Sequence, residues 1–370
     1  MRVVMFYHSI VSDWNHGNAH FLRGVASELL DRGHDVRVLE PREGWSRANL
    51  RRDHGDEAIA GFHRAYPRLR SDSYEAGSID LDAVLRGADL VMVHEWTEPA
   101  LVAAIGAHHQ HTPSYRLLFH DTHHRAVTDP SSMAAYDLRG YDGVLAFGDT
   151  LRDLYLERGW IDRAWTWHEA ADEKRFHPRP DASADAGDVV WIGNWGDDER
   201  TAELEEFLIA PVEALGLRAT MYGVRYPAAA RERLARAGIT YAGWLPNYDA
   251  PEVFARYKMT VHIPRRPYLD ALAGVPTIRP FEALACGIPL ISARWDRAGG
   301  LFTPGADFLV ARDGGEMASH MDRLASDPAL RASLAARGLS TIRARHTCAH
   351  RVDELLALYE RLDAPALESA

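Results

Sequence analysis

The sequence around Glu282 combines a carboxylate with the signals of a helix start. The run Arg279-Pro280-Phe281-Glu282 begins a short apolar segment that ends at Gly287 and continues into the aliphatic run 290–292. Proline suits the first turn of a helix, and glycine suits the left-handed residue that ends one. A helix N-terminus also favours anions, through its free amide groups and its dipole. Glu282 could therefore grip sugar hydroxyls beside a bound phosphate, or it could only satisfy its own helix; the spacing leaves both open.

A second candidate site is the loop of small residues Gly193-Asn194-Trp195-Gly196, which separates a predicted strand from a predicted helix. Glycines let a ligand approach the backbone closely, and the helix that follows would offer its N-terminus to a phosphate. Arg200 would add a charge-assisted contact. The acidic residues 197–199 weaken this prediction, and a tight turn beside a solvated acidic run is the alternative.

Two segments in the first half of the chain could also face a ligand. His120 and Asp121 lie at the end of a predicted strand, where a doubly wound sheet presents its ligand-binding groups. His16, Gly17 and Asn18 lie between the first strand and its helix, where the glycine would admit a substrate. A hydrogen-bonded loop histidine and a simple helix cap by Asn18 are the structural alternatives.

The sequence lacks the fingerprints of several common enzyme classes. It contains no Gly-x-Ser-x-Gly, no P-loop and no Gly-x-Gly-x-x-Gly motif. The histidine clusters at 108–111 and 120–124 do not have the spacing of zinc ligands. We therefore expect no metal and no cofactor.

Composition is typical of a soluble protein with two domains. The chain has 370 residues, of which 46% are hydrophobic and 26% are charged, and no apolar run is long enough to span a membrane. Its start does not resemble a secretory leader. Two cysteines, Cys286 and Cys348, argue against a disulfide framework, so we predict a cytoplasmic protein. The net charge of −11 disfavours a nucleic-acid partner.

Hydrophobic periodicity predicts alternating strands and helices in both halves of the chain. In the first half we expect strands at 2–8, 34–39, 89–94, 116–120 and 143–147, and helices at 19–32 and from Pro99, with Thr97 as cap. The polar stretch 41–76 is predicted to be a surface excursion of unassigned structure. In the second half we expect strands at 189–193, 218–222, 240–242, 259–263, 290–292 and 307–310, and helices at 200–215, 231–237 and 316–362, the last with a break at Asp327-Pro328.

This alternation indicates an α/β fold of two doubly wound, Rossmann-like parallel sheets, joined by a Pro- and Ala-rich linker at 178–187. We predict an N-terminal domain over 1–177, a C-terminal domain over 178–350, and a terminal helix within 351–370 that packs back on the first domain. Ligands should bind at the carboxyl ends of the strands, in a cleft between the sheets.

Three groups of motifs carry a resemblance to a known family. They are Gly17-Asn18 with Leu22-x-x-Val25-Ala26-x-x-Leu29 and Arg32-Gly33-His34-Asp35-Val36; Arg175-Phe176-His177-Pro178; and Phe281–Pro289. They resemble, in that order, the first strand–helix–strand unit, the segment entering the second domain, and the donor-site motif of GT-B glycosyltransferases, specifically the family 4-like retaining enzymes. Residues 191–200 and 279–282 look closest to the spore-maturation-protein-like branch. The resemblance spans about residues 1–360.

The resemblance implies a donor site for a UDP-, GDP- or ADP-sugar in the second domain. Glu282 would hold the ribose, the loop 193–196 and Arg200 would surround the diphosphate, and the backbone at Trp244 and Leu245 would meet the base. The other predicted donor residues are Tyr222, Arg266, Thr277, Arg279, Pro280 and Phe281. His120, with Asp121, would face the donor sugar, and His16, Gly17 and Asn18 would lie on the acceptor side. Retention would proceed through an oxocarbenium-like transition state, stabilised by arginines and helix dipoles without an obligatory metal.

One position departs from the family pattern. The family 4 motif has a second glutamate eight positions before the matched one, and here that position is Gly274. The lysine that usually accompanies the phosphate-binding arginine has no clear match, although Arg265, Arg266 and Arg279 lie nearby. The motif therefore predicts nucleotide binding and leaves the sugar unspecified.

We predict an enzyme, a glycosyltransferase that moves a sugar from a nucleotide sugar to an acceptor that the sequence does not name. One alternative is an epimerase-like or phosphorylase-like enzyme of the same fold. Another is a non-catalytic protein that binds a nucleotide sugar or a glycan, which Gly274 keeps open. Slow donor hydrolysis would separate a transferase from a binding protein.

Overall fold

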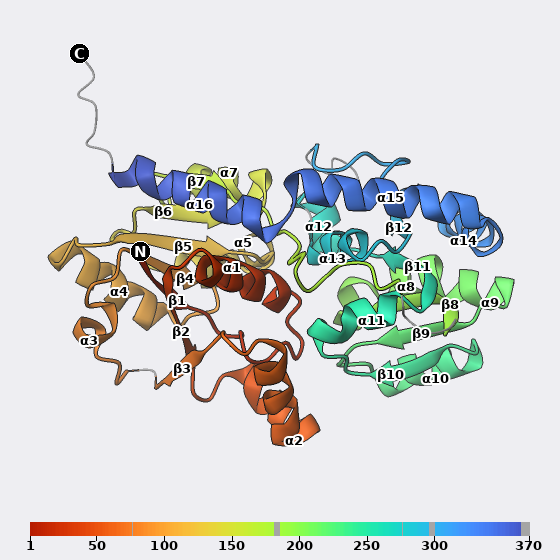
Figure 1. The fold of residues 1–370 in the computed structure, drawn as a ribbon, viewed down its shortest axis with the longest axis horizontal. Coiled ribbons are helices and arrows are strands. Elements are labelled where there is room, and N and C mark those ends of the chain that lie inside the picture. Colours follow the sequence, from red (N-terminus) through yellow and green to blue (C-terminus); the bar gives the residue numbers. More distant parts are fainter. Residues whose placement is uncertain (76, 181–185, 276, 296–299, 364–370) are drawn as a thin grey trace, which may run out of the picture. The chain divides into compact units, whose positions relative to one another are not determined.

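The structure is a computed structural model that describes residues 1–75, 77–180, 186–275, 277–295 and 300–363. The linker predicted at 178–187 and the terminal helix predicted within 351–370 lie partly outside these ranges. The chain divides into two compact units, each with its own parallel sheet (Figure 1). The first unit contains Met1–Ser12, Leu22–His168 and the segment from Cys348 onward, and the second contains Asp13–Phe21 and Glu169–Thr347.

The first unit is built on seven parallel strands in the order β3-β2-β1-β4-β5-β6-β7. They are β1 (Arg2–Phe6), β2 (Asp35–Pro41), β3 (Ser71–Tyr74), β4 (Leu90–His94), β5 (Arg116–Asp121), β6 (Gly143–Ala146) and β7 (Ala164–Thr166). The central strands are apolar and almost completely buried, as expected for a parallel sheet that is covered on both faces. Strand order reverses between β1 and β4, and doubly wound sheets commonly bind ligands at the carboxyl edge beside such a reversal.

Helices cover both faces of this sheet. They are α1 (Ala19–Asp31), α2 (Trp45–Ala65), α3 (Leu81–Leu85), α4 (Pro99–His111), α5 (Arg125–Thr128), α6 (Pro130–Ala134), α7 (Asp149–Glu157) and α16 (Cys348–Asp363). Hydrogen bonds and an ion pair attach the C-terminal helix α16 to the rest of this unit. Trp167 Nε1 donates to the carbonyl oxygen of Arg351 at 2.9 Å, and Arg32 pairs with Asp353 at 2.6 Å.

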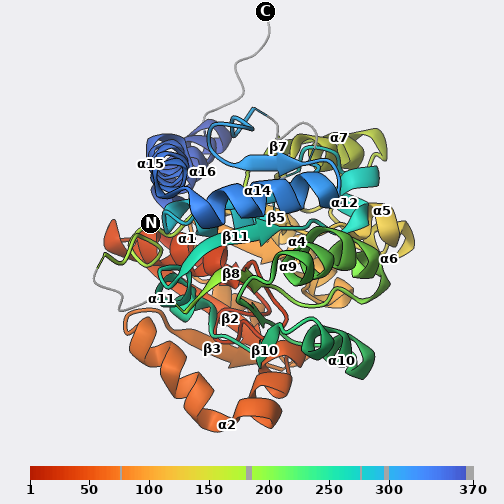
Figure 2. The same cartoon turned by 90° about the vertical axis from the view of Figure 1, so that its right-hand side faces the viewer.

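The predicted strands of the first unit are confirmed to within two residues. Two details differ. The residue that precedes α4 is Glu98, not Thr97, and its side chain makes no cap hydrogen bond. The stretch 41–76 contains α2 and β3, and both Figure 1 and Figure 2 place α2 beside β3. Gly55, at φ 70°, interrupts the helical geometry of α2, which obscures its periodicity in the sequence.

The second unit is built on six parallel strands in the order β10-β9-β8-β11-β12-β13. They are β8 (Gly187–Ile192), β9 (Ala219–Tyr222), β10 (Thr240–Gly243), β11 (Tyr257–His262), β12 (Leu290–Ala293) and β13 (Leu309–Ala311). A buried cluster that includes Trp191, Leu208 and Met259 forms the core between this sheet and its helices. Here the strand order reverses between β8 and β11.

The helical elements of the second unit include several short turns. They are η1 (Asp197–Glu199), α8 (Thr201–Leu204), η2 (Glu205–Ile209), α9 (Ala210–Leu215), α10 (Ala228–Arg236), η3 (Asn247–Asp249), α11 (Ala250–Phe254), α12 (Arg266–Asp270), α13 (Ile278–Ala285), α14 (Gly314–Ser326) and α15 (Pro328–Arg345). The helix predicted at 200–215 contains a π-helical turn, η2. The predicted break at Asp327-Pro328 is confirmed, because the Asp327 side chain caps α15 by accepting from Leu330 N at 2.9 Å. A second break, at residues 346–347, was not predicted.

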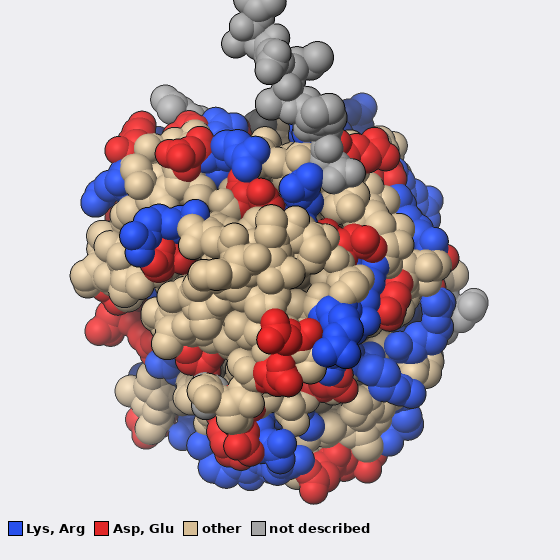
Figure 3. All heavy atoms as spheres, turned by 90° about the vertical axis from the view of Figure 1, so that its left-hand side faces the viewer, with Lys and Arg blue, Asp and Glu red and all other residues tan. Residues whose placement is uncertain are grey.

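Charges of both signs are mixed on the surface. On the face in Figure 3, positive and negative side chains alternate around a broad uncharged area. Helix α4 carries no Asp, Glu, Lys or Arg. Among the described residues, no helix is long and apolar enough to cross a membrane.

Candidate functional site

The loop Gly193–Gly196 follows β8, at the point where the strand order of the second sheet reverses. Gly193 N donates to Tyr222 O at 2.8 Å, and Tyr226 Oη donates to Gly193 O at 2.9 Å. Asn194 Oδ1 accepts from Val224 N at 3.0 Å. The loop is therefore held against the segment that follows β9.

Two glycines are required by this close approach. A Cβ on Gly193 would lie 2.7 Å from the Trp191 ring, and a Cβ on Gly223 would lie 2.0 Å from Gly193 O. Both distances are shorter than atoms can tolerate. Gly196 ends the loop in the left-handed region, with φ 85°. The backbone, and not the side chains, sets the shape of this loop.

The Arg200 side chain also holds the loop 193–196 in place. Its guanidinium donates to three carbonyl oxygens: those of Asn194, of Trp195 at 3.3 Å, and of Ile263 at 3.1 Å. Its Cζ also lies 5.0 Å from the centre of the Trp191 ring. The sequence predicted a phosphate contact for Arg200, and the structure adds a role in joining the loop after β8 to the end of β11.

Three arginines converge at this edge of the second sheet. Burial and the positive charges of Arg265 and Arg279 lower the pKa of Arg200 to about 9. Burial, Arg200 and Arg279 also lower the pKa of His262, at the end of β11, to about 3, so this histidine is neutral. Arg265 pairs with Glu199 and Arg279 pairs with Glu282, whereas Arg200 has no carboxylate partner among the described residues, so its charge suits this edge to an anion.

Two acidic residues pair with arginines in this cluster. Arg265 pairs with Glu199 at 3.0 Å, and Arg266 donates to Glu199 O at 3.1 Å. Glu203 lies 3.4 Å from Arg266. Glu199, in the acidic run 197–199, therefore orients two arginines. These acids do not by themselves argue against an anion site here.

Glu282 lies in α13 and is completely buried. Its Oε1 accepts from Asn247 Nδ2 at 2.6 Å, and its Oε2 pairs with Arg279 one turn earlier. Burial raises the pKa of Glu282, while Arg279 and Asn247 oppose that rise. The two partners thus offset part of the cost of burying this carboxyl group.

His20 approaches the same carboxylate from the start of α1. Its Nδ1 lies 3.5 Å from Glu282 Oε1, and its Nε2 accepts from Asp172 N at 2.9 Å. An amide N–H can only donate, so Nε2 carries no proton and a neutral ring carries its hydrogen on Nδ1, toward the glutamate. The His20 ring also contacts Phe176 edge-on, with 3.9 Å between centroids.

Asp13 completes a chain of buried polar groups in the second unit. It accepts from Trp244 Nε1 at 3.0 Å and from Asn247 N at 2.9 Å. Asn247 Oδ1 is buried and has no hydrogen-bond partner among the described residues. An unsatisfied acceptor beside Glu282 is suited to a ligand hydroxyl.

The loop after β1 packs with the second unit although β1 belongs to the first. His16, Gly17 and Asn18 lie within this loop, and a Cβ on Gly17 would lie 3.3 Å from Ile278 at the start of α13. The predicted acceptor-side residues therefore lie beside the helix that carries Glu282. Sequence spacing gave no signal for this, because the loop and α13 are about 260 positions apart.

The remaining predicted donor residues differ in what they can offer. Trp244 and Leu245 are partly buried after β10. Thr277 precedes α13, and its hydroxyl lies 3.0 Å from His262 Nε2. Tyr222 hydrogen-bonds through its hydroxyl with Tyr257, at the opposite end of β11. The other three predicted donor residues, Trp195, Pro280 and Phe281, are buried. The Phe281 ring packs against Phe302.

The backbone conformation at position 274 explains why a glycine stands there. Its φ is 85°, in the left-handed region that favours glycine. A glutamate at this position would adopt a strained conformation, so the departure from the family motif is built into this turn.

In the first unit, His120 ends β5 and is buried. Its ring lies among those of His94, Trp167 and Tyr7, with centroids 5.3, 4.9 and 6.2 Å away. Burial lowers the pKa of His120 to about 3, so its imidazole is neutral. A neutral imidazole among aromatic rings can orient a ligand but carries no charge to offer it.

Asp121 and Glu95 form a pair of buried carboxyl groups at the ends of β5 and β4. Asp121 accepts from Tyr155 Oη at 2.7 Å and from His123 N at 2.9 Å. Glu95 pairs with Arg125 at 2.7 Å. Burial raises the pKa of Asp121 to about 6, and burial with the neighbouring Asp121 charge raises that of Glu95 well above its ordinary value. The two groups titrate as a pair.

Asp121→Asn should therefore stabilise the first unit at neutral pH. A folded pKa above the unfolded one means that ionisation opposes folding, so the wild-type protein loses stability as pH rises from about 4 to 6. The variant cannot ionise there, and we expect it to be about 2 kcal/mol more stable at pH 7.5 and no more stable at pH 4. Urea unfolding at the two pH values measures this. An equal difference at both would contradict it.

The sequence analysis missed four polar residues of these sites: Asp13, His20, Glu95 and Asn247. Glu95 directly follows a predicted strand, the same signal that singled out His120. The other three carry no such signal, because contacts distant in the sequence bring them together.

Comparisons with known proteins bear on the family and the fold of the chain. Residues 200–357 match the family model described as glycosyl transferase-like. No curated protein sequence matches the chain.

Several solved structures are similar over nearly the whole chain. Sucrose-phosphate synthase from Thermosynechococcus elongatus is 15% identical, with a TM-score of 0.66, covering 98% of this chain and 99% of that one. Anabaena HepE in complex with UDP and glucose is 14% identical, with a TM-score of 0.68 and coverage of 97% and 99%. An alpha-glucosyltransferase in complex with UDP and a 13-mer DNA is 13% identical, with a TM-score of 0.69 and coverage of 97% and 99%. At these identities the likeness shows the fold, and it confirms the predicted GT-B architecture.

Proposed function

We propose that this chain, a glycosyltransferase-like enzyme with the GT-B fold, transfers a sugar from a nucleoside-diphosphate sugar to an acceptor hydroxyl. The observation that carries the proposal is the convergence of Arg200, Arg265 and Arg279 at the carboxyl edge of the second sheet. The charge of Arg200, which is paired with no carboxylate among the described residues, lies beside the loop after β8, and a diphosphate there would also meet free amide groups at the N-terminal turn of α13.

The nucleoside would bind beside this cluster. A ribose hydroxyl can donate to the buried Asn247 Oδ1, and it can reach Glu282 Oε1 by replacing the Asn247 amide there. The base would lie near Trp244 and Leu245, and UDP is the first nucleotide to test because HepE and the alpha-glucosyltransferase bind it.

The arginines would stabilise the departing diphosphate. In that case the protein supplies electrostatic stabilisation and orientation, and a phosphate oxygen takes the proton of the acceptor. We propose retention of configuration, as in the family 4-like enzymes that the motif resembles, and activity without a divalent cation. NMR of the product's anomeric proton tests the first, and turnover in excess EDTA tests the second.

The first unit would bind the acceptor. His120 and Asp121 end β5 and Glu95 follows β4, at the carboxyl edge of its sheet, where acceptor groups would be oriented. The two cysteines, both free and buried, are consistent with a reducing compartment, and we propose a cytoplasmic enzyme whose acceptor is not a nucleic acid.

Thermal shifts with UDP-, GDP- and ADP-sugars test the proposal directly. A donor at about 100 times its dissociation constant stabilises the protein by roughly 2.7 kcal/mol, a shift of several degrees. Slow hydrolysis of the same donor should accompany binding. Glu282→Gln, which keeps the size of the side chain, should lose both. Absence of a shift with every nucleotide would contradict donor binding, and binding without hydrolysis or transfer would indicate a binding protein.

A further inference from the structure

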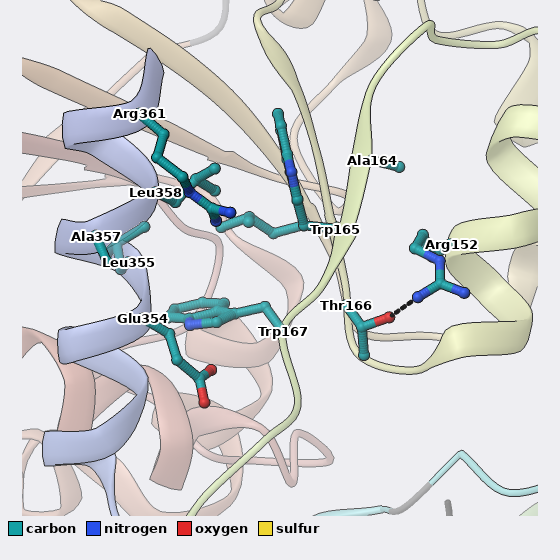
Figure 4. Close-up of a pocket in the computed structure, with 11 residues that line it drawn as sticks. Arg152, Ala164, Trp165, Thr166, Trp167, Glu354, Leu355, Ala357, Leu358 and Arg361 are labelled. Carbon is teal, nitrogen blue, oxygen red and sulfur yellow. Dashed lines mark hydrogen bonds between the residues drawn. The ribbon is translucent and has the colours of Figure 1, made fainter. Parts of the chain in front are cut away.

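A cavity of about 650 Å³ lies in the first unit between β7, at the edge of the sheet, and α16 (Figure 4). Pockets of this volume commonly hold small molecules. Trp165 and Trp167 line it from β7 and the residue after it, and Leu355 and Leu358 line it from α16. None of these residues belongs to the donor site or to the carboxyl pair.

Both tryptophans are held in place. A Cβ on Gly143, in the neighbouring strand β6, would lie 2.3 Å from the Trp165 ring, so the glycine makes room for the indole to lie flat against the sheet. The Trp167 indole N–H donates a hydrogen bond to the carbonyl oxygen of Arg351, and the Trp167 ring contacts the ring of His120. Aromatic surfaces fixed in this way lose little conformational entropy when a ligand binds.

The cavity has a cationic end and an anionic end. Arg361 extends from α16 toward Trp165 and forms no hydrogen bond or ion pair with any residue that the structure describes (Figure 4). Glu354 lies near Trp167 and uses one oxygen to pair with Arg351. Seven residues of helix separate Arg361 from Glu354, which places them about 10 Å apart along the helix axis.

Arg152 also lines the cavity, but its charge is already neutralised. It pairs with Asp149 at 2.9 Å and with Asp153 at 2.7 Å, and it donates to Thr166 Oγ1 at 3.0 Å. Arg361 is therefore the arginine of this cavity whose fork is available to a ligand.

We propose that this cavity binds an anionic carbohydrate, with its sugar ring against the partly exposed Trp165 and its phosphate or carboxylate on Arg361. Indole faces match the C–H face of a sugar ring, and a guanidinium binds either anion in a bidentate manner. The free oxygen of Glu354 accepts a sugar hydroxyl at the other end. An apolar ligand would bury the Arg361 guanidinium without a partner, which is unfavourable.

Calorimetry with four probes tests the ligand class in the presence of saturating UDP. Glucose 6-phosphate and glucuronate separate phosphate from carboxylate recognition, and glucose and inorganic phosphate each represent half of the ligand. We expect at least one anionic sugar to bind 10-fold or more tightly than glucose and than phosphate. Equal affinity for all four, or loss of binding once UDP is present, would overturn the proposal.

Variants locate the site. Arg361→Gln should reduce the affinity for the anionic sugar to that of glucose, and Trp165→Ala should weaken both sugars at least 10-fold. Trp165→Phe keeps most of the packing and should retain the anion preference, which separates stacking from stability. Arg337→Gln removes another exposed arginine, on α15, and should change nothing. Arg361 is exposed, so its replacement should not unfold the unit. An unchanged preference of Arg361→Gln for the anionic sugar would overturn the assignment.

Discussion

Arg279→Ala should lower the free energy of unfolding of the second unit by about 3 kcal/mol, the largest loss that we expect from a single change in the donor site. It should also abolish transfer. Glu282 is fully buried and the Arg279 side chain is 15% exposed. Removing the guanidinium leaves a buried carboxylate with Asn247 as its remaining hydrogen-bond donor of normal length. It also removes one of the three positive charges at the proposed diphosphate site.

Two measurements separate these effects. The loss of stability should shrink as the pH is lowered, because the Glu282 carboxyl, whose pKa is already raised by burial, then takes up a proton and no longer needs the arginine. The double variant Arg279→Ala with Glu282→Gln should recover most of the stability at pH 7.5 and none of the donor binding. Because Glu282→Gln alone should already lose donor binding, recovered binding in the double variant would contradict a donor-binding role for both Arg279 and Glu282.

Gly223→Ala should distort the loop after β8 and weaken donor binding by more than 10-fold. A methyl group there would meet the carbonyl oxygen of Gly193 at 2.0 Å, and the residue has φ 150°, which L-residues rarely adopt. The backbone 193–196 must move to make room, so overpacking of about 1–3 kcal/mol adds to the strain. Isothermal titration with UDP and thermal unfolding measure the two consequences.

Gly238→Ala is the matched control for this substitution. Gly238 also has a positive φ, of 70°, but a Cβ there meets no atom within 4 Å. It should cost about 1 kcal/mol of backbone strain and leave the affinity for UDP unchanged. If both variants lose the same stability and neither loses affinity, the loop 193–196 does not contact the donor.

The elements around the donor motif were predictable because their signals are local. Pro280 and Gly287 fixed the extent of α13 to within a few residues, and Gly287 has the expected positive φ of 68°. The buried strands appeared as short apolar runs in the sequence, because a parallel sheet that is covered on both faces admits few polar residues. Such features depend on residues close together in the chain.

Helix α2 was not predicted, because its sequence lacks such a local signal. Only five of its residues are buried, and Gly55 interrupts its helical geometry, so no regular apolar face was visible in the sequence. Its position depends on packing against the first unit and not on its own periodicity.

The sequence by itself determined the two doubly wound sheets, the small-residue loop after β8 and the carboxylate of α13, because strand burial, turn glycines and helix ends are specified locally. Only the tertiary structure decided what those groups contact. It joined Arg200 to the carbonyl oxygen of Ile263 and brought Asp13, His20 and Asn247 to the network around Glu282. These contacts join residues separated by dozens to hundreds of positions, and a buried polar group takes whichever partner the fold brings to it.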